Sequence, residues 1–512
     1  MGSLNIDILL VFAAIIVMVY LLIKEYLRPG LILFSTVVLL LLCGVIDSKD
    51  ALAGFSNKGV ITVAMLFLVS EGVRRSNCLS PVMGFILPTE GRITTHQGYL
   101  RILPTVASIS AFLNNTPIVI IFIPHIKAWC VKNGLPLKKF LIPLSYAAIL
   151  GGMCTLIGTS TNLVVHGLML DAGLEGFTMF EIGKVGVIIT LFGVGYLILF
   201  ADKRIDAYTP FVESNKQHRV EVVLSSRFAG IRCTIEQFDF QKHYGATIEA
   251  VRRDGEIIED LEEYEYKEND TLILSAPDSF IDTWGESRVF VIMTNGGNHT
   301  LQVPRWKTLL TLALLLIMVV GATISQLPII SRFLGTAETD MFFWAAVVTV
   351  IMALSNIFPA KKYTKFISWD ILITIASALA ISRAMTVSGF ADFIASMLID
   401  ISGSISPYLL LAILYIITNI ITELITNNAA AAFAFPIGLA AATKIGVNYM
   451  PFCIAIAIAA SASFSTPIGY QTNMIVQGLG GYSFKEFLKI GLPLNIITFI
   501  ISMIFIPLFW NF

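Results

Sequence analysis

The chain has 512 residues, of which 56% are apolar and 13% are charged, and its formal net charge is −1. Together with a mean hydropathy of +0.80, this composition argues against an ordinary soluble domain and is typical of a membrane protein with many spans. The near-zero net charge gives no support for nucleic-acid binding. The six cysteines are scattered and form no C-x-x-C pair, so we expect neither a metal site nor a disulfide framework.

Apolar runs of spanning length recur along the chain. They lie near 4–23, 31–46, 59–73, 141–170, 179–200, 308–330, 341–358, 369–387, 451–480 and 487–510. The first run has no basic segment before it and no small-residue cleavage site after it. We therefore interpret it as a retained membrane helix rather than a signal peptide.

Two further apolar stretches, 102–130 and 407–443, are interrupted by polar clusters. Lys and Arg mark the cytoplasmic side of membrane proteins. Their distribution fits only if 102–130 enters from the cytoplasm and returns there, while 407–443 enters from outside and returns there. Each arm of 102–130 has about 13 residues, or roughly 20 Å of helix, which is too short for a hydrocarbon core of roughly 30 Å. Both stretches are therefore predicted to be re-entrant hairpins.

These assignments predict an all-α polytopic membrane protein whose two halves have five spans each and opposite orientations, with both termini outside. The predicted units are a first membrane repeat over 1–205, a hydrophilic insert over 206–300 and a second membrane repeat over 301–512. The halves also repeat in sequence, because "NNTPIVIIFIP…GTSTNLVVHGL" in the first matches "NNAAAAFAFP…GYQTNMIVQGL" in the second. This is the inverted-repeat plan of secondary transporters, which bind their substrate near the membrane midplane where helices break.

Polar clusters at membrane depth are predicted to break helices at four places, 114–117, 158–162, 426–429 and 466–473. Non-helical backbone survives at this depth only where it lines a cavity or is buried in protein. Each new half-helix would present free N–H groups and the positive end of its dipole to an anion. The carbonyl groups that end the preceding half-helix, with Asn and Ser oxygens, would suit a small cation such as Na⁺. The pattern predicts one anion site flanked by two cation sites.

The segments "NNTPIV", "GGMCTLIGTSTN", "TELITNNAAAAFAFPI" and "FSTPIGYQTN" resemble the paired motifs of the divalent anion:Na⁺ symporter family, which carries di- and tricarboxylates and sulfate. "LAGFSNKGVITVAMLFLVSEGVRRS", near the start, is also similar. The resemblance covers essentially the whole membrane portion. It implies one re-entrant hairpin and one broken helix in each repeat, at about 102–130 and 141–170 in the first and at about 407–443 and 451–480 in the second.

In that family, a Ser-Asn-Thr triplet at each hairpin tip binds Na⁺ and substrate. Carried over by motif position, the implied cation ligands are Ser110, Asn114, Asn115, Gly158, Glu423, Asn427, Asn428 and Gly469. The implied contacts to the substrate anion are Asn115, Thr116, Thr159, Ser160, Asn428, Ala429, Tyr470 and Gln471. Asn replaces the first Ser of both triplets and Ala429 replaces the second Thr, so the chain is more similar to sulfate-type members that carry a cytoplasmic insert. Glu423 could ligate a cation, carry a proton or pair with another group.

The hydrophilic insert switches to alternating apolar and polar residues. "EVVLSS" and "TLILSA" are predicted strands, and "TIEQFDFQKHYGATIEAVRRDGEIIED" is predicted to form a helix, a strand, an Arg-Asp-Gly turn and another strand. This order resembles the TrkA-C domain of K⁺-conductance regulators, which implies a small α+β domain that dimerises and binds a small anion or a nucleotide as a regulator. Lys242, Arg252 and Arg253 are the basic residues available to such an effector. The alternative is a plain cytoplasmic spacer.

From the motifs and the resemblance together, we expect a secondary active transporter that imports a small divalent anion, either sulfate-like or a dicarboxylate, coupled to Na⁺. The expected mechanism is elevator-type alternating access by a homodimer in the lipid bilayer of the cell (inner) membrane. The alternatives are a proton-coupled transporter and a ligand-gated anion channel. The sequence contains no acid pair, catalytic triad, metal-ligand cluster or Gly-rich phosphate loop, so neither an enzyme nor ATP-driven transport is expected.

Overall fold

The structure is a computed structural model that describes residues 6–512 with several gaps. Not described are residues 1–5, 25, 77, 80, 81, 83, 85, 88–93, 206–218, 226, 254, 255, 259, 260, 262, 263, 278, 279, 281–283, 285, 286, 288, 295–303, 326–338 and 402–405. The predicted limits of the insert at 206 and 300, and the end of the predicted span 308–330, therefore lie outside the described residues.

The first membrane half begins with a long apolar helix. Helix α1 (Ile6–Lys24) has 19 residues, or roughly 28 Å of helix, which is enough to span a hydrocarbon core. Asp7 lies in its first turn and Lys24 in its last, where each charge is favourable to the helix dipole. The other helices of this half are α2 (Pro29–Leu42), α3 (Ser48–Ala53), the 3-10 helix η1 (Gly54–Ser56), α4 (Lys58–Ser76), α6 (Thr95–Ser110), α7 (Asn115–Asn133), α8 (Lys138–Gly152), α9 (Ser160–Asp171) and α10 (Gly183–Arg204).

The second membrane half is also helical. It consists of α13 (Arg305–Ile324), α15 (Met341–Leu354), the 3-10 helix η2 (Ala360–Phe366), α16 (Trp369–Val387), α17 (Phe390–Ile401), α18 (Pro407–Leu424), α19 (Asn427–Ile445), α20 (Met450–Ser461), α21 (Gln471–Gly480) and α22 (Phe484–Phe509). Within the described part of the chain, eight helical stretches are long and apolar enough to cross a membrane, counting Ser48–Ser76 as one. The protein is therefore built as an integral membrane protein with several passes.

Two predicted spans are shorter than expected. Helix α2 ends at Leu42 and α15 at Leu354, whereas the hydropathy runs continue to 46 and 358. In both cases a residue in the left-handed region stops the helix two positions later, Gly44 with φ of 75° and Asn356 with φ of 53°. Such residues close the last turn of a helix by bonding back to its carbonyl groups. Hydropathy alone does not detect this signal.

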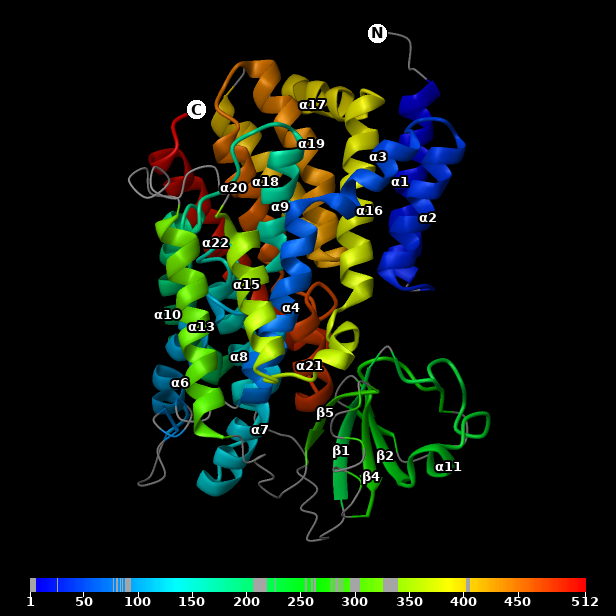
Figure 1. The fold of residues 1–512 in the computed structure, drawn as a ribbon, viewed down its shortest axis with the longest axis vertical. Helices are drawn as coiled ribbons and strands as arrows, with labels where there is room; N and C mark the ends of the chain where they lie inside the picture. Colours follow the sequence, from blue (N-terminus) through cyan, green and yellow to red (C-terminus); the bar gives the residue numbers. More distant parts are fainter. Residues whose placement is uncertain are drawn as a thin grey trace.

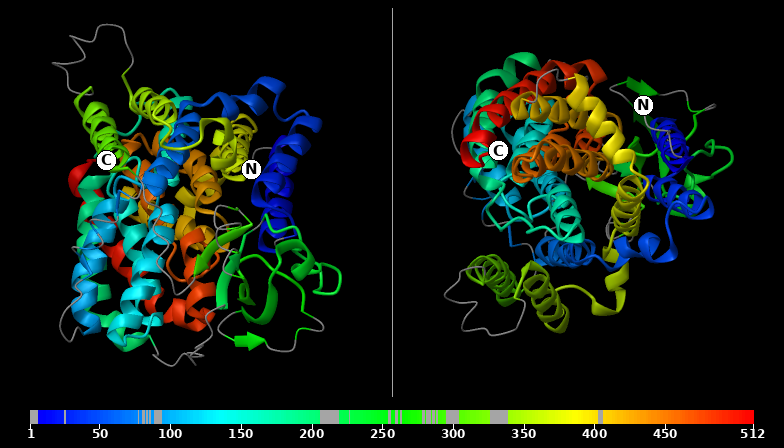
Figure 2. Two further views of the ribbon diagram at one scale, coloured as in Figure 1. Left: turned by 60° about the horizontal axis from the view of Figure 1, so that its bottom comes forward. Right: turned by 90° about the horizontal axis from the view of Figure 1, so that it is seen from above.

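The centre of the molecule is formed by α8 and α20. Phe140–Gly152 and Pro451–Ser461 are buried at every position, which is the pattern of helices surrounded by protein on all sides. Seen from above, α1 with α2 and α13 with α15 stand at the rim of the bundle (Figure 2). The rim helices expose large apolar side chains such as Leu9, Phe12, Leu309 and Leu316, as expected of surfaces that face lipid.

Two helical hairpins approach the centre from opposite ends of the molecule. Helices α6 and α7 come from the end where the insert lies, and α18 and α19 come from the end where both termini lie (Figure 1). The first hairpin extends over 95–133, with arms of 16 and 19 residues, rather than the predicted arms of about 13. A capping box of Thr94 and Gln97 starts it earlier, and Gly134, with φ of 63°, ends it later.

The insert contains a five-stranded antiparallel sheet in the order β3-β2-β4-β1-β5. The strands are β1 (Arg219–Leu224), β2 (Thr247–Arg253), β3 (Glu256–Ile258), β4 (Thr271–Ser275) and β5 (Phe290–Thr294). All four predicted strands are present, as β1 to β4, whereas β5 was not predicted. The predicted helix is only the five-residue α11 (Phe240–Tyr244), because Gly245 with φ of 72° ends it. A separate apolar core that includes Val222, Tyr266 and Leu274 supports the sheet.

The sheet docks against two helices of the membrane part. Lys127 Nζ on α7 lies 3.1 Å from Glu221 Oε2 on β1. Arg252 on β2 donates to the carbonyl oxygen of Leu479 on α21 at 3.1 Å. A Cβ atom at Gly478 would lie 2.5 Å from the carbonyl oxygen of Asn269, so only glycine permits this close approach. The insert therefore contacts the first hairpin and the half-helix α21 together.

Candidate functional site

The hairpin tips are held by matching hydrogen bonds. Ser110 Oγ donates to Asn115 Oδ1 at 2.7 Å, and Thr422 Oγ1 donates to Asn427 Oδ1 at 2.9 Å. Asn115 is the first residue of α7 and Asn427 the first of α19. Asn427 is thus the counterpart of Asn115, whereas the sequence repeat aligned Asn115 with Asn428. Because each tip has two successive asparagines, the sequence allowed either alignment. The structure pairs Asn115 with Asn427, one residue earlier than the sequence alignment did.

The two helix breaks are also held by matching contacts. Asn162 Nδ2 donates to the carbonyl oxygens of Gly152 at 3.3 Å and Thr155 at 2.8 Å. Asn473 Nδ2 donates to those of Ser463 at 3.0 Å and Thr466 at 3.3 Å. Each asparagine satisfies carbonyl groups that the end of the preceding helix leaves without partners. Both asparagines stood in the quoted motifs but not among the predicted site residues.

Four half-helices begin at these tips and breaks, and none is capped by its own N-cap side chain. The N-cap residues are Asn114, Thr159, Thr426 and Tyr470, for α7, α9, α19 and α21. Asn and Thr at this position ordinarily accept a hydrogen bond from the first turn of the helix. Because these side chains do not, the N–H groups of four first turns are left for another acceptor.

The side chains at these starts meet across the two halves in a set we call the central cluster. Thr116 Oγ1 donates to Gln471 Oε1, and Ser160 Oγ donates to Asn428 Oδ1, each at 3.2 Å. The central cluster consists of Asn115, Thr116, Thr159, Ser160, Asn428, Tyr470 and Gln471. Seven of the eight predicted substrate contacts are therefore brought together. The eighth, Ala429, is buried in α19 and has no polar side-chain atom.

The electrostatics of the central cluster favour an anion. All seven side chains are uncharged, so the positive potential comes from the helix ends. Each helix N-terminus is equivalent to roughly half a positive charge, and four of them offer roughly two. This magnitude matches a divalent anion without the cost of desolvating a Lys or Arg side chain at membrane depth.

Neutral oxygen atoms crowd around each break beside the central cluster. A Cβ atom at Gly158 would lie 2.5 Å from the carbonyl oxygen of Gly152 and 3.0 Å from that of Ala111. Ser110 Oγ and Asn115 Oδ1 complete this group on the first side. Carbonyl, hydroxyl and amide oxygens of this kind are ligands that suit Na⁺.

The second side has an equivalent group. A Cβ atom at Gly469 would lie 2.9 Å from the carbonyl oxygen of Thr422, and Thr422 also holds Asn427 Oδ1. Thr466 Oγ1 donates to the carbonyl oxygen of Glu423 at 2.9 Å, just as Thr155 Oγ1 donates to that of Ala111 on the first side. The predicted cation ligands thus fall into two groups, one at each break.

The carboxylate of Glu423 closes the second break. Its Oε1 accepts from the backbone N–H of Phe464 at 2.9 Å and of Ser465 at 2.8 Å, and its Oε2 accepts from that of Thr466 at 2.8 Å. Asn495 Nδ2 also donates to Oε1, at 2.7 Å. Charge-assisted bonds to backbone N–H groups are among the stronger hydrogen bonds in proteins. The structure therefore assigns this carboxylate a partner, the backbone of residues 464–466.

The three basic residues proposed for an effector do not form one cluster. Arg253 makes two bonds to Asp270, at 2.8 and 2.6 Å, and this carboxylate raises the pKa of Arg253. Arg252 points to α21 as described above. Lys242 is exposed on α11. Arg252 and Arg253 are neighbours in a strand and so face opposite sides of the sheet.

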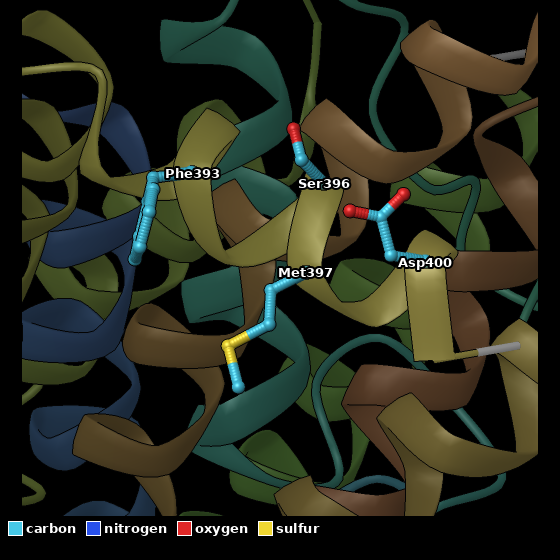
Figure 3. Close-up of a pocket in the computed structure, with 4 residues that line it drawn as sticks. All are labelled: Phe393, Ser396, Met397 and Asp400. Atoms are coloured by element: carbon cyan, nitrogen blue, oxygen red, sulfur yellow. The ribbon is translucent and has the colours of Figure 1, made fainter. Parts of the chain in front are cut away.

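A pocket on the surface lies elsewhere. Phe393, Ser396, Met397 and Asp400 line it along α17 (Figure 3), which lies across the end of the molecule where the termini are (Figure 1). None of these residues belongs to the central cluster. The pocket is therefore not the site that the motifs predicted.

The proteins similar to this chain include several that are named as transporters. An uncharacterised transporter of Synechocystis sp. is 27% identical to the chain, with 98% of this chain and 97% of that protein covered. Sodium/sulfate cotransporter 1 of Chlamydomonas reinhardtii is 33% identical over 42% of this chain and 25% of its own length.

The fold also has a solved counterpart. The YdaH transporter of Alcanivorax borkumensis superposes with a TM-score of 0.53 at 11% identity, covering 90% of this chain and 87% of that one. The family described as CitMHS, citrate transporter, matches residues 11–344 and 333–511. The chain belongs to this family of transporters.

Proposed function

We propose that the protein is a secondary active transporter that imports a small divalent anion, sulfate-like or a dicarboxylate, together with Na⁺. The observation that carries the proposal is the convergence of four uncapped half-helix N-termini on the uncharged central cluster. The anion would bind among these N–H groups and the side chains of Thr116, Ser160, Asn428 and Gln471. The name of the sodium/sulfate relative supports Na⁺ as the coupling ion.

The coupling cations would bind in the two oxygen groups beside the breaks. On the first side the ligands are Ser110, Asn114, Asn115 and Gly158, and on the second side Asn427 and Gly469. Glu423 holds the second break beside this group, and Asn428 faces the anion. Na⁺ at these positions would draw each hairpin tip against its break and so fix the N–H groups that meet the anion. Ordering by a first ligand lowers the entropic cost of binding the second, which couples the two without direct contact.

The mechanism we propose is an elevator motion of the hairpins and broken helices against the rim helices. The matching contacts at the tips and breaks support two inverted repeats, in which case the site opens alternately to the two sides. The insert would then be cytoplasmic and regulatory, in a homodimer within the inner membrane. Its dock on α7 and α21 places it beside elements that the motion would displace.

Uptake by purified protein in proteoliposomes tests this proposal. Labelled sulfate, succinate and citrate are each supplied with and without an inward Na⁺ gradient, at two pH values. Saturable uptake that requires Na⁺ is the expected result. Uptake driven by a pH gradient without Na⁺ would favour proton coupling, and non-saturating flux that ignores Na⁺ would favour a channel.

A further inference from the structure

The two halves of the central cluster differ most at one position. Thr159 and Tyr470 are both N-cap residues of the second half-helix of their break. Their hydroxyl groups lie 2.9 Å apart. Because the aromatic side chain is much longer, Tyr470 crosses to the first half, where its hydroxyl accepts from Asn115 Nδ2 at 2.6 Å.

The ring of Tyr470 therefore stands between the two hairpin tips. Its hydroxyl lies beside Asn115 and Thr159, at the starts of α7 and α9. The phenol therefore takes up space between the two tips that a threonine at this position would leave. An extended dicarboxylate needs space at both tips for its two carboxylate groups, whereas a tetrahedral oxyanion carries its whole charge in one compact group.

We infer that Tyr470 makes the site selective for a compact tetrahedral oxyanion of the sulfate class and excludes extended dicarboxylates. This inference rests on the proposed function and narrows its substrate. The phenol acts in two ways: its volume shortens the space between the two tips, and its hydroxyl meets Asn115 and Thr159. A shape-based site rejects the wrong ligand by occupied volume and by polar groups left without partners.

Competition against labelled sulfate uptake tests the inference in wild type. Selenate should compete like sulfate, while succinate and citrate should be weaker by about tenfold or more, the range expected for a pocket of the wrong size. Tyr470→Thr copies the residue of the first half and should lower the ratio of succinate to sulfate inhibition constants by about tenfold. Tyr470→Phe is the matched control, because it keeps the ring; it should weaken sulfate but still reject succinate.

The possible outcomes distinguish failure of this inference from failure of the proposed transport function. Wild-type preference for succinate or citrate overturns the inference and leaves Na⁺-coupled anion import intact. An unchanged preference in a Tyr470→Thr protein that still takes up sulfate also overturns it. Absence of Na⁺-dependent uptake of every anion supplied overturns both.

A different observation carries a second inference, about the insert. In the first half, the glycine after the "STNLVVH" motif, Gly167, packs against Asn57 at the start of α4; Asn57 Nδ2 donates to its carbonyl oxygen at 3.0 Å. The matching glycine of α21 is Gly478, and there the close neighbour is Asn269 of the insert. The insert takes on α21 the place that the start of α4 takes on α9.

In an inverted-repeat transporter, the opposite state exchanges the contacts of the two halves. Helix α21 would then pack against the start of α16, as α9 now packs against α4. We infer that the docked insert blocks this exchange and holds the site open toward its own side. This autoinhibitory contact rests on the elevator motion proposed above.

A cross-link makes the contact permanent. Asn269 Nδ2 lies 3.4 Å from Met474 Sδ, so the thiols of Asn269→Cys and Met474→Cys should lie within reach of a short, reducible bis-methanethiosulfonate cross-linker. Cross-linking should lower uptake by about tenfold or more in the double variant only, and reductant should restore it. Thiol labelling followed by mass spectrometry verifies that the link formed. Full uptake by the cross-linked protein overturns the inference.

Weakening the contact between the insert and α21 should have the opposite effect on uptake, and this test needs no cross-link. Arg252→Ala removes the bond to Leu479 and should raise the maximal uptake rate several-fold. Gln241→Ala, which removes an exposed side chain of α11 in the same insert, should leave the rate unchanged. Equal rates in wild type and Arg252→Ala would contradict a blocking role.

Discussion

Asn115 and Asn427 occupy the same position in the two halves: each begins a half-helix and each accepts a hydrogen bond from a hydroxyl group five residues earlier. Asn428, the next residue, instead faces Ser160 across the central cluster. Neighbouring asparagines of the second tip therefore have different partners. One lies among the oxygens proposed for the cation, and the other lies where the anion is proposed to bind.

This division predicts different kinetic effects for the two neighbours. Asn115→Ala and Asn427→Ala should each weaken Na⁺ activation of uptake by about 10- to 100-fold, because each removes an oxygen beside a cation. Asn428→Ala should raise the KM for the anion by a similar factor while the Na⁺ dependence changes little. Na⁺ titrations at saturating anion, and anion titrations at saturating Na⁺, separate the two effects. A wild-type Na⁺ response in both Asn115→Ala and Asn427→Ala would remove these residues from the cation sites.

Glu423 provides a second prediction, about stability. Glu423→Gln puts an amide N–H₂ against backbone N–H donors and should lower the free energy of unfolding by about 1–3 kcal/mol. Thermal unfolding in detergent measures this loss. Asp392→Asn is a matched control, because Asp392 is an exposed acid on α17, and it should change the unfolding temperature little. If Glu423→Gln unfolds like wild type but shifts the Na⁺ dependence, the carboxylate acts on the cation rather than on the break.

The insert should lose stability at high pH. Burial raises the pKa of Tyr264, and the carboxylate of Asp270 beside it raises the pKa further. The folded insert therefore keeps Tyr264 protonated at a pH where the unfolded chain ionises it. Its contribution to stability is complete below a pH of about 10 and decreases as the pH rises beyond that value. Hydrogen exchange of β4 at increasing pH measures this change, after correction for the intrinsic exchange rate. Tyr264→Phe should flatten the dependence, and an equally steep loss in that variant would exclude Tyr264 as its cause.

A buried ion pair joins the two halves of the membrane part. Lys138 Nζ on α8 lies 2.9 Å from Glu486 Oε1 on α22, with side chains only 9% and 13% exposed. Lys138→Met leaves Glu486 buried without its partner and should cost about 3–5 kcal/mol of stability. Glu486 Oε2 also accepts from the backbone N–H of Ser483 in the capping box of α22. The double variant with Glu486→Gln, which keeps this cap without the charge, should recover most of that loss, which thermal unfolding of the three proteins would show. Equal losses in the single and double variants would mean that packing, not charge, holds this contact.

The positions of the hairpin tips and helix breaks could be predicted because they have local signals, whereas the lengths of the hairpin arms could not. Clusters such as Asn114–Pro117 interrupt apolar runs, and polar groups at membrane depth need partners. Seven of the eight residues expected to contact the anion do converge. The alignment of the second tip was wrong by one residue, because two successive asparagines give no local sign of which begins the helix.

Other features depend on contacts between distant parts of the chain. The backbone partners of Glu423 lie about 40 residues further along, and Asn495 lies further still. Nothing near Glu423 indicates that its carboxylate binds a helix break. Likewise, Arg252 was assigned to an effector because it is basic and lies in the insert, while its partner on α21 is 227 residues away.

The proposed blocking contact between the insert and α21 would couple the insert to the membrane site in both directions. If anion and Na⁺ change how firmly the insert is held, then, by thermodynamic reciprocity, any molecule that binds the free insert must change the affinity for anion and Na⁺ by the same factor. A soluble ligand could thus set the membrane site without entering the membrane. Conversely, the state of that site would be readable from the water-exposed surface of the sheet.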